Sequence, residues 1–297
     1  MSYIIETKNL TKKYGGKCAV DNVDIHIEKG DIYGFIGKNG AGKTTLMRLV
    51  LGLDFPTSGE IEIFGSKDLN KGRAKIGSLI EAPGLFKSCS AYENLKRFSI
   101  LYGGTEEDIQ EILKFVGLDD TGKKPAGVFS LGMKQRLGIG IALLGNPEVL
   151  VLDEPINGLD PAGIKDIRNL LLKLNHERGV TIFIASHLLD ELSKIVTKYG
   201  IINNGKLIEE VSAQELAERC KTYVSIKVDN VEKASQILKS KFATLKYETN
   251  QNEVLVFNEN LEPTEILKEL IKGGVLIKEM KDTQSDFEDY FIERIGV

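Results

Sequence analysis

The sequence predicts an α/β protein with two domains, and three observations lead to this prediction. First, residues 30–36 form a short apolar run, which a glycine-rich loop separates from a helical segment that begins at Thr45. Second, continuous apolar runs at 149–152 and 180–185 are typical of buried parallel strands, and the segment 164–177 between them has helical spacing. Third, residues 221–297 have the spacing of a separate series of strands and helices.

Length and composition limit the classes of protein to consider. A chain of 297 residues is long for one compact core, and 42% hydrophobic with 28% charged residues is ordinary for a globular protein. The net charge of −4 gives no reason to expect a nucleic-acid partner. The three cysteines, Cys18, Cys89 and Cys220, are too scattered for a metal site or a disulfide framework, as expected in a reducing cytosol.

No segment resembles a secretory signal or a membrane span. The N-terminus lacks a basic region followed by an apolar one. The most apolar tract, residues 137–145, is far shorter than the roughly 20 residues that a spanning helix needs. We therefore expect that the chain does not cross a membrane by itself.

The first domain is expected to cover residues 1–220 and to contain a helical insert. Alternating residues before position 36, and again at 60–64, predict strands. From about residue 82 to 145 the spacing becomes helical, with Gly and Pro between the segments. The predicted helices of this insert are 91–102, 106–116 and 133–144.

Residues 221–297 are expected to form a small α+β domain. The periodicity predicts strands and helices in the order β-α-β-β-α-β, which is the ferredoxin-like order. The strands are expected at 223–228, 244–248, 253–257 and 275–280, the helices at 231–242 and 263–272, and a last amphipathic helix at 285–295.

The glycine-rich loop matches the phosphate-binding pattern G-x-x-x-x-G-K-[ST]. Its glycines let successive backbone N–H groups point into one concavity at a helix N-terminus, which suits an anion. Lys43 can reach the β- and γ-phosphates of a nucleotide, and the Thr44 hydroxyl can ligate Mg²⁺. The residues expected to contact the nucleotide here are Gly37, Lys38, Asn39, Gly40, Ala41, Gly42, Lys43, Thr44 and Thr45.

Two acids follow the buried strand at 149–152. Asp153 is expected on the Mg²⁺ side of the phosphates, and Glu154 is placed to act on an attacking water. The alternative is that both acids merely cap a helix, whose dipole favours negative charge at its N-terminus. The phosphate-binding loop upstream favours the catalytic interpretation.

A second helix start lies 23 residues before Asp153, at Phe129-Ser130-Leu131-Gly132-Met133-Lys134-Gln135-Arg136. Ser130 and the Gly132 backbone would provide donors for a second anion site. This segment resembles the signature motif of the ATP-binding cassette (ABC) family. The order of phosphate loop, signature, Asp-Glu strand and Ser186-His187 is also similar to that family over roughly residues 1–220.

The resemblance implies a P-loop ABC ATPase domain with a helical subdomain, in which two cassettes sandwich two ATP molecules. Tyr14 would stack on adenine, although a strand-edge aromatic is the ordinary alternative. Ser130 and Gly132 would hold the γ-phosphate of the nucleotide bound to the partner cassette. Asp160 would lie in the loop that crosses the dimer interface, and His187 would contact the γ-phosphate, whereas His26 and His176 are taken as structural.

The sequence departs from the family pattern at two places. Glu81 stands where the family usually has a glutamine that ligates Mg²⁺ and senses the membrane partner, and we count it as a candidate metal ligand and catalytic residue. Leu131 and Met133 replace the first glycine and the glutamine of the signature. Both departures resemble the bacterial exporters that handle bacitracin and lantibiotic-type peptides or give immunity to them.

The resemblance implies an ATP-hydrolysing subunit that uses ATP and Mg²⁺ and works with a separate membrane permease and a second cassette. Such a subunit would be cytoplasmic and peripheral on the inner face of the cell membrane. Three alternatives stay open: a non-transport ABC ATPase acting on ribosomes or DNA, an ATP-driven assembly module with little hydrolysis, and a P-loop small-molecule kinase.

Overall fold

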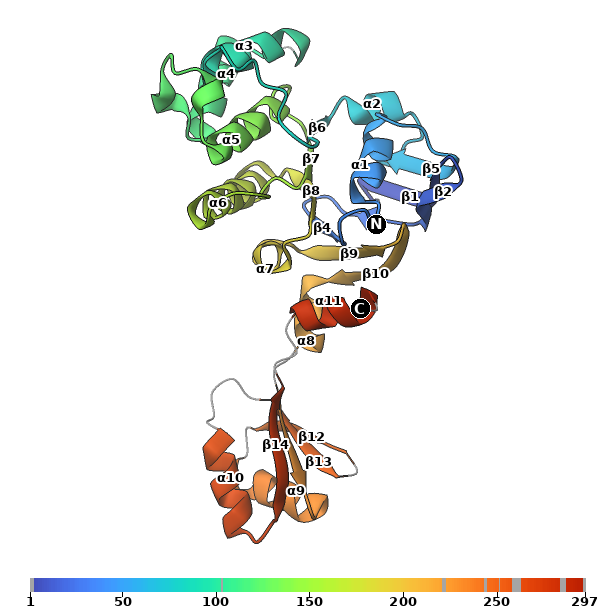
Figure 1. Ribbon diagram of the computed structural model, residues 1–297, viewed down its shortest axis with the longest axis vertical. Helices are drawn as coiled ribbons and strands as arrows, with labels where there is room; N and C mark the ends of the chain where they lie inside the picture. Colours follow the sequence, from blue (N-terminus) through green and yellow to red (C-terminus); the bar gives the residue numbers. More distant parts are fainter. Residues whose placement is uncertain are drawn as a thin grey trace. The chain divides into compact units, whose positions relative to one another are not determined.

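The computed structural model describes residues 3–102, 104–220, 223–242, 245–250, 252–257, 263–283 and 287–295. The chain divides into two compact units, Met1–Ala213 and Gln214–Val297, and each has a core of its own. This boundary at Ala213 comes earlier in the chain than the expected one at residue 220. Figure 1 shows the elements of both units along the chain.

A six-stranded sheet in the order β10-β9-β4-β8-β7-β6 is the centre of the first unit. Four of its five neighbouring pairs are parallel, and only β10 runs antiparallel to its neighbour β9. Every residue of β4, β7 and β8 is buried, as the continuous apolar runs predicted. The bounds are β4 Ile32–Ile36, β6 Ile76–Leu79, β7 Val149–Asp153, β8 Thr181–Ser186, β9 Lys198–Asn203 and β10 Lys206–Ser212.

A second, antiparallel sheet holds the N-terminal strands, which the sequence had not separated from the first sheet. In it β1 pairs with β2, β3 and β5. Helix α1 (Lys43–Leu51) contributes Leu46, Leu49 and Val50 to a core shared by residues of both sheets. The bounds of the strands are β1 Ile5–Tyr14, β2 Lys17–Val23, β3 His26–Ile27 and β5 Ser58–Ile63.

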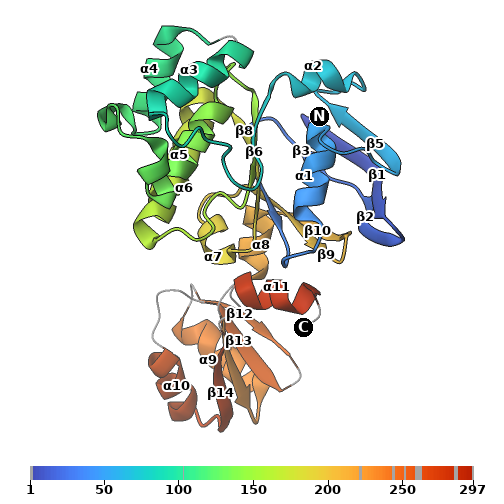
Figure 2. The ribbon, with the colours of Figure 1, turned by 45° about the horizontal axis from the view of Figure 1, so that its top comes forward.

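The helical insert is present as predicted, and Figure 2 shows its helices gathered on one side of the unit. Helix α4 begins with a capping box between Thr105 and Asp108. Ser130 caps α5, and its hydroxyl accepts from the Met133 N–H. Asp160 caps α6 ahead of Pro161, so this helix begins earlier than predicted. The bounds are α3 Ala91–Tyr102, α4 Glu106–Phe115, α5 Leu131–Ala142 and α6 Pro161–Arg178.

Several elements had no counterpart in the sequence prediction. Strands β9 and β10 extend the central sheet by a hairpin whose turn is Asn204-Gly205, both at positive φ. The short helices are α2 Leu69–Arg73, α7 Leu189–Leu192 and α8 Ala213–Arg219, together with single 3₁₀ turns at Asp119–Thr121 and Ala126–Val128. Within the described ranges, no helix is long and apolar enough to cross a membrane.

The second unit has the predicted β-α-β-β-α-β order. Its antiparallel sheet runs β12-β13-β11-β14, and Ile226, Val254 and Val256 face the core that contains residues of α9 and α10. The closing helix α11 contacts α8 through a hydrogen bond that Arg219 donates to the Tyr290 hydroxyl at 2.9 Å. The bounds are β11 Tyr223–Val228, α9 Val231–Lys241, β12 Lys246–Thr249, β13 Glu253–Phe257, α10 Pro263–Lys272, β14 Ile277–Thr283 and α11 Phe287–Ile295.

Candidate functional site: a nucleotide pocket

The phosphate-binding loop connects β4 to α1, as the motif predicted. A Cβ atom on Gly37 would lie 2.5 Å from the backbone oxygen of Ile202, so only glycine fits there. Gly42 has a φ of +112° and precedes the first residue of α1. The loop therefore curls tightly around the start of the helix, where free N–H groups and the helix dipole attract anions.

Lys43 lies inside this loop and is 5% exposed. Its Nζ donates to the backbone oxygens of Gly37 at 2.6 Å and Lys38 at 3.3 Å, and lies 3.3 Å from Oε1 of Glu154. The ammonium group is thus held at the centre of the loop, where a phosphate oxygen can replace one of its partners. This geometry suits contact with a polyphosphate.

Asp153 ends strand β7 and faces the first turn of α1. The Thr44 hydroxyl donates to Asp153 Oδ2 at 2.7 Å. The Asp153 side chain is 3% exposed, and burial is the main cause that raises the pKa of its carboxyl group. Its Oδ1 is buried and has no hydrogen-bond partner among the described residues. A buried carboxylate oxygen beside a hydroxyl is a donor set of the kind that Mg²⁺ prefers, so these two residues fit the ion.

Glu154, the second acid, is joined to the end of the neighbouring strand β8. Its Oε2 accepts from the Ser186 hydroxyl at 3.2 Å and lies 2.9 Å from His187 Nδ1, while Oε1 faces Lys43. The backbone of Glu154 has a φ of +49°, which costs about 1–3 kcal/mol for a residue with a side chain. Its N–H donates to the Ala185 oxygen at 2.9 Å, which helps to hold this conformation. The carboxylate is therefore held between an ammonium and an imidazole, where it can accept a proton from a water.

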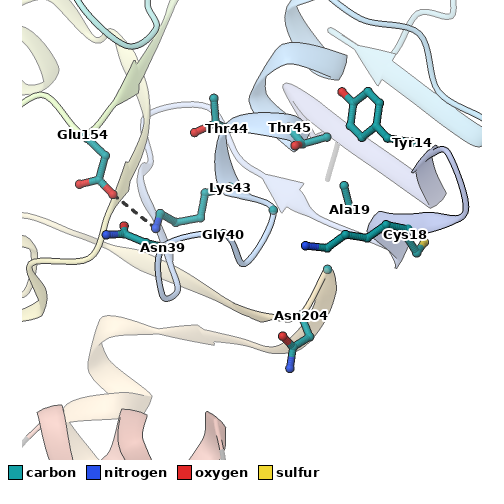
Figure 3. Close-up of a pocket in the computed structure, with 13 residues that line it drawn as sticks. Tyr14, Cys18, Ala19, Asn39, Gly40, Lys43, Thr44, Thr45, Glu154 and Asn204 are labelled. Carbon is teal, nitrogen blue, oxygen red and sulfur yellow. Dashed lines mark ion pairs between the residues drawn. The ribbon is translucent and has the colours of Figure 1, made fainter.

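Lys43, Thr44 and Glu154 line one pocket of about 470 Å³, together with the loop residues Asn39, Gly40, Gly42 and Thr45. Figure 3 shows Lys43 directed at Glu154 on one side and Tyr14 at the opposite end. Tyr14 is 47% exposed and is the last residue of β1, followed by the turn at Gly15. A pocket with an anion nest at one end and an aromatic ring at the other suits a nucleotide.

Part of the pocket wall was missed by the sequence reasoning. Lys17, Cys18 and Ala19 of β2 line it, together with Asn204 and Gly205 from the hairpin turn between β9 and β10. Gly205 donates its N–H to the Ala41 oxygen at 2.8 Å, so this turn is bonded to the phosphate loop. The Asn-Gly pair was a usable hairpin signal, but nothing local connected it with the loop.

Glu81 follows β6 and is 68% exposed at its side chain. Its Oε1 lies 3.6 Å from Arg48 of α1, and its charge contributes to the raised pKa of Asp153. The structure therefore brings Glu81 near the acids of the pocket but pairs it with an arginine. Glu81 also has a φ of +61°.

Ser130, Gly132 and Asp160 lie together at a different pocket, of about 360 Å³. Ser130 and Asp160 cap α5 and α6, and Asp160 Oδ1 accepts from the Gly163 N–H at 2.8 Å. None of the described residues that line this pocket lines the first one. Within one chain, the signature segment and the phosphate loop are separate sites.

The comparisons agree with the geometry. The ABC transporter family profile matches residues 20–157. The chain is 42% identical over 300 residues to the bacitracin transport ATP-binding protein BcrA of Enterococcus faecalis, covering 100% of this chain and 97% of that protein. It is 44% identical over 207 residues to the lantibiotic transport ATP-binding protein SrtF of Streptococcus pyogenes, covering 70% of this chain and 90% of that protein.

A solved structure extends the similarity to the fold. The dimeric ATP-binding cassette MJ0796, in a post-hydrolysis state bound to ADP and Pi, has a TM-score of 0.64 and 28% identity. That similarity covers 70% of this chain and 98% of MJ0796.

Proposed function

The chain belongs to the ATP-binding proteins of ABC transporters, and from this membership we propose that it powers the export of an antimicrobial peptide through a separate membrane permease. Relatives that carry the names of bacitracin and lantibiotic transport proteins support this choice of cargo class. The observation that carries the enzymatic part is the Lys43–Glu154–His187 arrangement at the phosphate end of the pocket.

ATP is the proposed substrate. The backbone N–H groups of residues 37–45 bind its phosphates, and Lys43 offsets charge on the β- and γ-phosphates. Tyr14 stacks on the base at the other end of the pocket. The proposed nucleotide contacts are therefore the loop residues and this ring, as the sequence predicted.

Thr44 and Asp153 would hold Mg²⁺, since their oxygens are adjacent and Asp153 Oδ1 has no described protein partner. Bound there, the ion would offset charge on the phosphate oxygens. Glu81 is close enough to influence this ion by its charge, and Arg48 neutralises part of that charge.

Glu154 is the proposed group that accepts a proton from the attacking water. Ser186 and His187 hold one carboxylate oxygen, which orients the other toward the phosphate loop. A positioned base of this kind contributes about 10²–10⁴-fold to a rate. His187 would also reach the γ-phosphate, because its ring lies beside Glu154.

Two cassettes are proposed to act together. Ser130, Gly132 and Asp160 lie apart from the pocket of their own chain, so they are free to complete the pocket of a second cassette. The working complex would contain two cassettes and the permease, with this chain on the inner face of the cell membrane. The loop at Glu81 and the helical insert would carry the motion to the permease.

The variant Glu154→Gln tests the hydrolytic role. It removes the base but keeps the size of the side chain, so we expect ATP binding within about threefold of wild type and turnover lower by about 10²-fold or more. Phosphate release and equilibrium ATP binding measure the two quantities. The matched control is Glu107→Gln, an exposed acid in α4 that should leave both unchanged. Wild-type turnover in Glu154→Gln would refute the assignment.

Transport is tested by affinity purification of the chain from detergent-solubilised native membranes, followed by mass spectrometry. A polytopic membrane protein in stoichiometric amount is the expected partner. Cells that lack this membrane protein should be more sensitive to the exported peptide. Recovery of ribosomal proteins or of a soluble complex alone would contradict transport while leaving the ATP site intact.

A further inference from the structure

The ring of Tyr14 is held by two charged residues that no motif singles out. Tyr14 stands at the end of β1 with about half of its side chain exposed, a place where an unanchored ring could turn freely. Its hydroxyl donates to Oδ2 of Asp54. The ring is thus fixed at its tip by a carboxylate from the segment that follows α1.

Asp54 is itself fixed. Its Oδ1 accepts from Lys12 Nζ at 2.6 Å and from the Phe55 N–H at 2.7 Å. Lys12 also donates to the Phe55 oxygen at 2.7 Å, and only 13% of its side chain is exposed. One carboxylate therefore ties a lysine, a tyrosine and a backbone amide into a single cluster.

Lys12 also contacts the ring directly. Its Nζ lies 4.8 Å from the centroid of the Tyr14 ring, within the range of a cation–π contact. Lys12 and Tyr14 are two residues apart on one strand, so their side chains leave β1 on the same face. Tyr14 lines the nucleotide pocket, whereas Lys12 is not among the residues that line it.

The charges of the cluster support a permanent arrangement. Hydrogen bonds from Lys12 and then from Tyr14 lower the pKa of Asp54 to about 2, and the same carboxylate raises the pKa of Tyr14. At neutral pH the carboxylate is therefore ionised and the phenol keeps its proton, which is the state in which the phenol donates to it.

We propose that Lys12 and Asp54 are positioning residues that hold the Tyr14 ring against the nucleobase. This inference rests on the proposed function, since it assumes that the base lies at the Tyr14 end of the pocket. Lys12 occupies one face of the ring and leaves the face toward the pocket for stacking. The cluster, named here the Tyr14 clamp, consists of Lys12, Tyr14 and Asp54.

The clamp acts on the base and not on the phosphates, which lie at the other end of the pocket (Figure 3). Disturbing it should weaken binding of ATP but not of inorganic tripolyphosphate. Stacking tolerates any base because every base has a π-face. The clamp should therefore raise the affinity for ATP and GTP alike without choosing between them.

The test measures the affinities of the full chain for ATP, GTP and tripolyphosphate by titration calorimetry, together with KM and kcat for ATP. In Tyr14→Phe and Asp54→Ala we expect ATP and GTP to bind about threefold to tenfold more weakly and KM to rise by the same factor. Tripolyphosphate affinity should stay within twofold, as should kcat. Tyr14→Ala, which removes the ring, should lose more ATP and GTP affinity than either of these variants.

Lys12 has a matched control in its neighbour Lys13, which is exposed. The ATP affinity of Lys12→Met should fall as in Asp54→Ala, whereas that of Lys13→Met should equal wild type. Lys12→Arg should retain most of the ATP affinity because it keeps the cation. Tyr14→Phe removes only the hydroxyl group, so this variant still tests the clamp if Asp54→Ala does not fold.

Unchanged ATP affinity in Tyr14→Phe and Lys12→Met would overturn the clamp. An equal loss of affinity for ATP and for tripolyphosphate would also overturn it, because that result indicates a merely structural role. A wild-type chain that binds tripolyphosphate but neither ATP nor GTP would overturn the clamp as well, because no base would reach the ring. Failure of the wild type to bind or hydrolyse ATP at all would overturn the proposed function, and the clamp with it.

Discussion

The acidic residues around β7 illustrate how burial and local charge set the chemistry of single side chains. Asp153 is nearly enclosed, and desolvation raises the pKa of its carboxyl group. The cation proposed to bind Oδ1, which has no hydrogen-bond partner among the described residues, would offset the free energy that this burial costs. Glu154, one residue later, turns through a left-handed backbone conformation toward Ser186 and His187. Adjacent acids thereby face different partners.

Glu81 is the residue whose charge departs from the family pattern, and Glu81→Gln tests what that charge does. Because the Glu81 side chain is exposed and beside Arg48, screening keeps its effect small. We expect the Mg²⁺ concentration for half-maximal ATPase activity to rise about twofold to threefold, since a negative charge near the ion is lost. The measurement is phosphate release across a Mg²⁺ titration, and Glu107→Gln is again the control. Equal titration curves for Glu81→Gln and wild type would contradict this role.

Close contact between elements decides how the helical insert is attached to the sheet. Strand β6 is four residues long and ends just before Glu81. A Cβ atom on Gly77, in this strand, would lie 1.9 Å from the backbone oxygen of Ala142 at the end of α5. Glycine at this position lets the helix end approach the strand backbone directly, which couples the insert to the edge of the sheet.

Gly77→Ala should therefore destabilise the first unit, because the backbone of α5 must move to admit a methyl group. We expect a loss of about 1–3 kcal/mol in the free energy of unfolding, as for other overpacked sites. Denaturant unfolding measures it. Gly84→Ala is the control, since a Cβ there meets nothing within 4 Å. A Gly77→Ala variant as stable as Gly84→Ala would refute the close approach.

At the scale of the whole molecule, the nucleotide pocket belongs to one unit. All residues that line it lie in Met1–Ala213, and the core of Gln214–Val297 is built from other strands and helices. The chemistry proposed for the chain therefore does not draw on the second unit. That unit has its own ferredoxin-like sheet in the order β12-β13-β11-β14.

A fragment ending at Ala213 tests this division. It keeps the complete core and pocket of the first unit, so we expect it to fold and to bind ATP within about threefold of the full chain, because no binding contact is removed. Circular dichroism and ATP titration check the two expectations. A folded fragment that binds ATP more than tenfold more weakly would show that the second unit contributes to the site.

The sequence by itself determined the elements with strong periodicity and the sites made of consecutive residues. The phosphate loop, the acids after β7 and the helices of the insert all depend on neighbours in the chain, so their patterns are readable locally. The six-element order of the second unit was predicted for the same reason. The hairpin β9–β10 was missed because its short apolar run has no period that distinguishes strand from helix.

Only the tertiary structure decided which distant residues meet. Asp54 reaches Tyr14 from 40 residues away, Ser186 reaches Glu154 from 32 residues away, and Arg48 faces Glu81 across the ends of two elements. Each contact joins positions that different strands and helices bring together, so local sequence spacing cannot predict it. The reactive residues lie in short sequence motifs. The packing of the sheets and helices determines which distant residues contact and orient them.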